Sequence, residues 1–156
     1  MKSDELIIYR RRLPHWRVSG AIYFVTWRLA FHQPPLEPPE RDVIAAALLH
    51  FQGKRYWLLA HVVMNDHVHV LTQPIEEHSL QDIVHSWKSY TAHQLVKAGG
   101  RTGHVWQEEY FDRVMRDEPE LREKALYILG NPWKRWPDLA DYPWVACFWD
   151  VGAPGP

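Results

Sequence analysis

The chain has 156 residues, 46% hydrophobic and 24% charged, a composition that fits one folded domain and excludes a disordered chain. Its formal net charge of −1 excludes a uniformly basic surface, although the run from Tyr9 to Arg17 holds four arginines and no acid. Cys147 is the only cysteine, which excludes a disulfide framework and a thiolate zinc site. No apolar segment approaches the ~20 residues that span a membrane, and the N-terminal stretch lacks the apolar region of a signal peptide, so we expect a cytoplasmic protein.

Strand and helix patterns alternate along the first half of the chain. β-branched and aromatic residues predict a strand over 21–30, and the proline-rich stretch that follows predicts a loop. A helix is expected over 41–52, ended by a glycine. Mostly apolar residues predict a central strand over 55–64, and a turn at Asn65-Asp66 joins it to an antiparallel strand over 67–74.

The second half begins with a long helix. Ser79 is positioned to cap this helix, expected over 80–98, and a glycine cluster ends it. Residues 103–116 are expected to be extended and to contain a further strand. A last helix over 117–132 starts with a capping box and stops at Gly-Asn-Pro, and the aromatic tail over 136–156 is expected to be irregular.

This element order predicts a fold class. Strand, helix, two strands, helix and strand follow one another as in a ferredoxin-like α+β sandwich. We therefore expect one domain over 1–156, with a core of about 20–135. An antiparallel sheet would carry helices on one face, and a C-terminal helix and an aromatic tail would complete the domain.

Two histidines lie on the strand over 67–74. His67 and His69 are two residues apart, so their side chains point to the same sheet face, roughly 7 Å apart along the strand. Because the chain has 10 histidines, a chance pair is the alternative to a metal site. We expect the pair to lie on the sheet face that the helices leave open.

The last helix offers a nucleophile and a third ligand. On a helical wheel, Tyr127 and Asn131 lie side by side, away from the apolar stripe that packs on the sheet. The alternatives are a surface tyrosine and an ordinary helix-end asparagine. The competing tyrosine is Tyr90, which we interpret as a packing residue on the flank of its helix, with Lys88 exposed on the other flank. The expected apolar stripe consists of Leu121, Ala125, Ile128 and Leu129.

Three segments resemble the single-tyrosine DNA transposases, the histidine–hydrophobe–histidine (HUH) or IS200-like family. "VVMNDHVHVL" resembles their HUH signature, and "HVWQEEYFDRVMRDEPELREKALYILGNPWKR" resembles the second conserved block of the REP-associated tyrosine transposase branch. "RRRLPHW" and "GAIYFVTWRL" are similar to the opening of that branch. The resemblance spans most of residues 9–135 and implies a ferredoxin-like core. One departure is Asn65-Asp66, where many relatives have proline–asparagine.

The resemblance implies a role for each candidate residue. His67 and His69 become metal ligands, Asn131 an amide-type third ligand, and Tyr127 the nucleophile that forms a 5′-phosphotyrosine intermediate on single-stranded DNA at a REP-like hairpin. Neutral nitrogen and oxygen ligands suit Mg²⁺ or Mn²⁺, although imidazole also suits Zn²⁺. We expect a nucleoid-associated monomer or homodimer.

Basic and aromatic residues supply what single-stranded DNA binding requires. The alternative for the tryptophans is core or tail packing. Two other functions stay open: a non-catalytic hairpin-binding protein or regulator, and a metal hydrolase of small phosphodiesters. The expected DNA-binding residues are Arg10, Arg11, Arg12, Arg17, Lys88, Lys134 and Arg135, with Trp16, Trp133 and Trp136 beside them.

Overall fold

The computed structural model describes residues 20–148. The predicted arginine contacts at 10–12 and 17, and Trp16, lie outside the described residues. None of the helices in the described part is long and apolar enough to cross a membrane.

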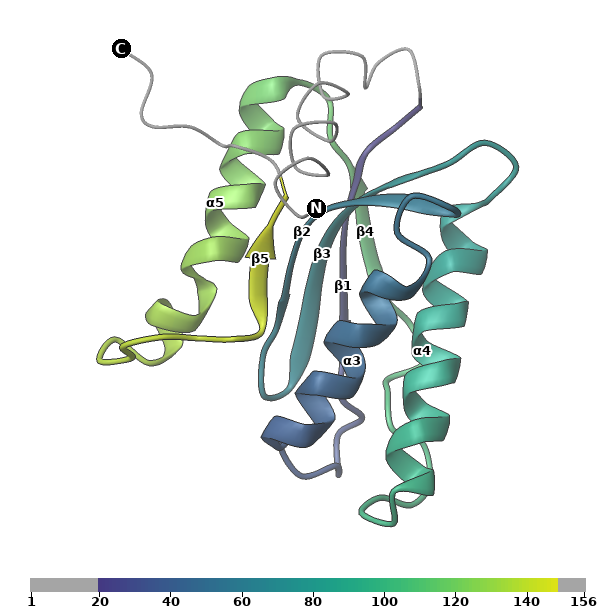
Figure 1. Ribbon diagram of the computed structural model, residues 1–156, viewed down its shortest axis with the longest axis vertical. Helices are drawn as coiled ribbons and strands as arrows, with labels where there is room; N and C mark the ends of the chain where they lie inside the picture. The colour runs from purple at the N-terminus through teal and green to yellow at the C-terminus, as the bar shows by residue number, and fades with distance from the viewer. Residues whose placement is uncertain (1–19, 149–156) are drawn as a thin grey trace.

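A five-stranded antiparallel sheet forms the centre of the molecule, with the strand order β4-β1-β3-β2-β5 (Figure 1). Its first four strands and the two helices between them follow the predicted ferredoxin-like order, which confirms the fold class. The strands are β1 (Tyr23–Arg28), β2 (Tyr56–Val63), β3 (His67–Pro74), β4 (Phe111–Val114) and β5 (Val145–Cys147).

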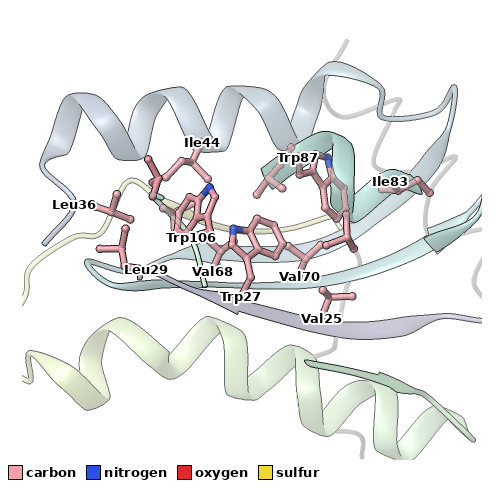
Figure 2. Packing of buried hydrophobic residues seen from close by; sticks show 14 of the residues in the cluster. Val25, Trp27, Leu29, Leu36, Ile44, Val68, Val70, Ile83, Trp87 and Trp106 are labelled. Carbon is pink, nitrogen blue, oxygen red and sulfur yellow. The ribbon is translucent and has the colours of Figure 1, made fainter. Parts of the chain in front are cut away.

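Helices cover the two faces of the sheet unequally. Figure 2 shows α3 (Pro38–His50) and α4 (Leu80–Lys97) on one face and α5 (Glu118–Arg135) on the other. On its face α5 packs against β2, β3 and β5. The sheet face that we expected to be free of helices is therefore partly covered by α5. The part of that face formed by β1 and β4 remains accessible.

Tryptophans fill the core between the sheet and the α3–α4 layer. The ring of Trp27 stacks on that of Trp87 at 5.7 Å between centroids, and Trp106 meets it edge-on at 6.2 Å (Figure 2). All three are at most 6% exposed. These tryptophans are packing residues, which is the alternative that the sequence left open.

The core on the other face is aliphatic and lies beneath α5. Leu121, Ala125 and Ile128 are fully buried there, as the helical period predicts, whereas Leu129 is only half-buried. Because this stripe faces the sheet, Tyr127 lies at its edge.

Two helix ends differ from the prediction. α3 begins at Pro38 rather than residue 41, because Glu37 and Glu40 form a capping box and prolines suit the first helical turn. α5 does not stop at Gly130–Pro132 but continues to Arg135. Pro132 removes one backbone donor, and its burial together with Asn131 offsets that loss.

The tail also departs from the prediction. Rather than being irregular throughout, it adds β5 beside β2. The hydroxyl of Tyr142 donates a hydrogen bond to the Val63 carbonyl at 2.7 Å, which fixes the tail at the end of β2.

Candidate active site

The two histidines of β3 face together. Antiparallel pairing places His69 opposite Thr26 and His67 opposite Arg28. The two imidazole centroids lie 4.6 Å apart, with the ring planes inclined at 71°. Both imidazole rings therefore lie side by side on the sheet face that α5 partly covers.

Each imidazole has a partner at Nδ1. The His67 Nδ1–H donates to a carboxylate oxygen of Asp66 at 2.6 Å. Nδ1 of His69 hydrogen-bonds the hydroxyl of Thr26 at 2.7 Å. These bonds orient both rings and leave Nε2 of each as the available ligand atom, an arrangement common to metal-binding histidines.

His69 is a neutral imidazole at neutral pH. Burial is the main reason that its pKa falls to about 3, and the charges of His67, Arg28 and Lys124 lower it further. A neutral ring is the form that binds a metal, so His69 is ready to act as a ligand without first losing a proton.

Tyr127 lies beside the histidine pair. Its ring centroid is 5.4 Å from that of His69 and 6.2 Å from that of Phe24, which itself stacks on His69 at 5.3 Å. Its side chain is 41% exposed, so the phenol is accessible to a substrate. A groove of about 560 Å³ opens here, lined by Phe24, Thr26, Trp27, Arg28, His69, Gln107, Glu109, Tyr110, Phe111 and Tyr127.

Tyr90 lies on the opposite side of the sheet. It is 53% exposed, more than a packing residue would be, and lines a groove of about 430 Å³ between α3 and α4. The sheet separates it from His67 and His69, so Tyr127 is the tyrosine that accompanies the histidines.

Asn131 is 8% exposed and lies one helical turn beyond Tyr127. Along α5, Lys124 lies over Phe24 and Tyr127 lies beside His69, so successive turns advance along β1 and β3. Within residues 20–148, no group of three or more His, Cys, Asp or Glu side chains is placed to hold a metal ion.

The family follows from a sequence comparison. A family model described as "Transposase IS200 like" matches residues 40–129, more than half of the chain. The chain belongs to this transposase family. The matched segment contains the histidine pair and Tyr127, and membership makes the protein a DNA-processing enzyme by class.

Two solved structures share the fold of this IS200-like transposase. One is a REP-associated tyrosine transposase bound to a REP hairpin, with a TM-score of 0.68 and 21% identity over 81% of this chain and 76% of that chain. The other is a candidate transposase from Deinococcus radiodurans R1, with a TM-score of 0.51 and 21% identity over 70% of this chain and 88% of that chain. No curated protein matches the sequence.

The predicted DNA-binding residues of this transposase lie in different environments. Lys88 is partly buried rather than exposed, because its ammonium donates to the carbonyls of Gln107 and Glu108 at 2.8 and 2.9 Å. Lys134 is exposed, with its Nζ 5.8 Å from the Tyr127 ring centroid. Arg135 is exposed over the ring of Trp136, at 5.2 Å.

Three residues at the site were not predicted from the sequence. Lys124 precedes Tyr127 by three residues, and its Nζ lies 5.7 Å from the centroid of the Tyr127 ring. Helical spacing alone predicts that these two side chains are neighbours. Arg28 lies opposite His67 only because of the β1–β3 register. Phe111 lines the groove from β4. The sequence around a single phenylalanine does not indicate that its side chain lies at such a groove.

Proposed function

We propose that this chain is a metal-dependent single-strand DNA endonuclease and strand transferase. It cleaves at hairpin, REP-like sequences through a covalent 5′-phosphotyrosine on Tyr127. The observation that carries the proposal is the 5.4 Å separation of the Tyr127 ring from His69, itself paired with His67. Family membership supports DNA processing, and the hairpin assignment is supported by the hairpin-bound structure of similar fold.

The protein's own ligands fit a divalent cation. Nε2 of His67 and of His69 would bind it, with the side-chain oxygen of Asn131 as the third ligand. Two imidazoles and an amide form a neutral set, so water and phosphate oxygens would complete the shell of Mg²⁺ or Mn²⁺. When bound, the cation supplies charge neutralisation to the scissile phosphodiester.

The phenol of Tyr127 is the nucleophile. Its oxygen attacks phosphorus, the bond from phosphorus to the 3′ oxygen breaks, and that oxygen leaves as a hydroxyl after taking up a proton. The phenol proton passes to solvent. One phosphodiester replaces another, so the step is reversible and a second 3′ hydroxyl can displace the tyrosine without an external energy source.

Basic side chains surround the proposed reaction centre. Lys124 and Lys134 lie on the same edge of α5 as Tyr127, one before it and one after it along the helix, with their Nζ atoms 5.7 and 5.8 Å from its ring centroid, and Arg28 lines the groove. Cations at these positions attract the DNA backbone and stabilise the charge that develops on the transferred phosphate.

The test is covalent capture. The protein is incubated with 5′- and 3′-labelled single-stranded REP-like hairpins and Mn²⁺, followed by denaturing electrophoresis. We expect a protein–DNA adduct that carries the 3′ label alone, because the 5′ fragment departs with its free hydroxyl. Binding of the hairpins without an adduct would support a non-catalytic DNA-binding protein instead, and hydrolysis of a small diester without any adduct would support a phosphodiesterase.

A further inference from the structure

We propose that Phe111 and Arg28 form a sequence-independent subsite for the nucleotide that adjoins the scissile phosphate. This subsite deepens the proposed function and rests on it. The base would stack on the Phe111 ring, and the Arg28 guanidinium would hold the adjacent backbone phosphate. The subsite belongs to the groove that contains Tyr127 and His69.

Phe111 is exposed on the catalytic face of the sheet. Its side chain is 55% exposed, although β4 places it directly opposite Thr26 on β1. Thr26 in turn lies opposite His69 on β3. The three residues form one row across the sheet, so Phe111 lies two strands from the ligand histidine, about 10 Å at the usual strand spacing.

Neighbouring rings hold this exposed phenylalanine in place. Phe24 contacts Phe111 edge-on at 6.4 Å between centroids, while its own ring is only 5% exposed. The same Phe24 ring contacts His69 and Tyr127. Phe111 is therefore supported on one side by the aromatic cluster of the reaction centre, and its exposed area is available to a flat, apolar ligand such as a nucleobase.

Arg28 brings the charge that a nucleotide requires. It is exposed at the end of β1, opposite His67, and lines the groove with Phe111. The exposed ring of Phe111 offers a surface on which a base can stack, and the guanidinium of Arg28 in the same groove can bind the adjoining phosphate. Single-stranded DNA is thus favoured over a second copy of this chain, which would cover the ring without needing the arginine.

The test measures binding without cleavage. In a Tyr127→Phe background, the probe is a fluorescein-labelled oligodeoxythymidylate that contains 5-iododeoxyuridine. We expect Phe111→Ala to weaken its binding about 5- to 100-fold. Phe111→Trp should retain binding, and Tyr90→Ala, which removes a ring of similar exposure on the other sheet face, should leave affinity unchanged. Irradiation should crosslink the probe to Phe111, identified by peptide mass spectrometry.

Arg28→Gln tests the phosphate contact. The slope of log affinity against log salt should fall in magnitude by about 0.7, the value for one phosphate contact on a single strand. The subsite is wrong if Phe111→Ala and Tyr90→Ala bind alike, if the slope is unchanged, or if the parent does not bind the probe. A change of oligomeric state in Phe111→Ala would instead identify the ring as a contact between copies. Adduct formation by the wild type is scored separately, so the subsite can fail while the proposed function stands.

Discussion

Thr26 and Asp66 each fix one ring nitrogen of the histidine pair, and neither residue belongs to the HUH pattern itself. The β1–β3 register places Thr26 directly opposite His69, where its hydroxyl hydrogen-bonds Nδ1 of the imidazole. Asp66 lies in the turn before β3 and accepts its hydrogen bond from Nδ1 of His67. Partners of this kind set the orientation of a ligand and support its basicity.

Thr26→Val tests the partner of His69. Valine keeps the shape of threonine and removes the hydroxyl, so Nδ1 of His69 loses its hydrogen bond in a buried position. We expect Mn²⁺ binding to weaken about 10- to 100-fold, measured by electron paramagnetic resonance of the free ion. Thr26→Ser keeps the hydroxyl and should bind Mn²⁺ nearly as the wild type does. Equal affinities for the valine and serine variants would contradict the assignment.

His61 gives the fold a dependence on pH that is separate from the site. It is 3% exposed, and Nδ1 is a buried ring nitrogen without a hydrogen-bond partner among the described residues. Burial lowers its pKa from 6.5 to about 4. Between those two pH values the unfolded chain binds a proton that the folded chain excludes, so stability is lost as the pH falls from 6.5 towards 4.

His61→Leu should remove part of this acid sensitivity. We expect the fall in the free energy of unfolding between pH 6.5 and pH 4 to shrink by up to roughly 3 kcal/mol, measured by urea denaturation. His93→Leu changes an exposed histidine and should leave the pH dependence as in the wild type. Parallel pH curves for His61→Leu and the wild type would show that His61 is not the cause.

At the scale of the element, the proposed function requires α5 to align a nucleophile, Tyr127, and a metal ligand, Asn131, on one edge. Tyr127 and Asn131 share that edge, yet Gly130 lies between them and Pro132 follows. Both residues weaken a helix: glycine because its backbone is freer in the unfolded chain, and proline because it lacks the backbone N–H that donates a hydrogen bond. The buried stripe against β2, β3 and β5 holds the helix despite them.

Gly130→Ala should strengthen this helix. A Cβ added at Gly130 would meet no atom within 4 Å, and the residue is exposed in a regular helix. We expect stabilisation of about 0.5–1 kcal/mol, seen as a higher urea midpoint with an unchanged slope. Destabilisation would mean that α5 requires the freedom of a glycine at this point.

The helical period of α5 and the alternation along β3 were sufficient to predict which side chains share a face. Both depend on local geometry alone, so Tyr127 and the histidine pair emerged from spacing. The end of α5 was not predictable in this way, because burial of Asn131 and Pro132 outweighs the local stop signal. The exposure of Lys88 was predicted wrongly for a similar reason, since its carbonyl partners come from a distant loop.

At the scale of the whole molecule, long-range pairing creates the site. The fold class followed from element order, but Arg28 and Phe111 join the histidines only through the registers of β1 with β3 and β4. A one-residue slip would turn these side chains to the other face, and no local pattern fixes that register by itself.

Arg101 holds the loops at the end of this sheet together. It is 5% exposed, forms a two-pronged ion pair with Glu40, and donates to the carbonyls of Pro34 and Pro35. Leu36, in the same loop, donates its backbone N–H to the Asn65 carbonyl, in the turn before His67. This network links α3 to the turn that precedes the histidines.

Arg101→Gln should destabilise the fold strongly. The change leaves Glu40 and two carbonyls without their cation, and loss of one partner of a buried pair costs roughly 3–5 kcal/mol. Urea denaturation measures the effect, with Arg113→Gln as the control, because the Arg113–Glu120 ion pair is partly exposed. Similar losses for the two variants would mean that Arg101 contributes no more than a surface pair.

The central claim is that Tyr127 attacks DNA beside the histidine pair, and one paired substitution tests it most directly. Tyr127→Phe and Tyr90→Phe each remove one phenol hydroxyl from a half-exposed ring, on opposite faces of the sheet. Both variants should fold and bind a labelled REP-like hairpin, measured by thermal unfolding and gel shift. With Mn²⁺ and denaturing electrophoresis, Tyr90→Phe should form the covalent adduct at the wild-type level and Tyr127→Phe should form none. An adduct that persists in Tyr127→Phe, or that disappears in Tyr90→Phe, would contradict the claim.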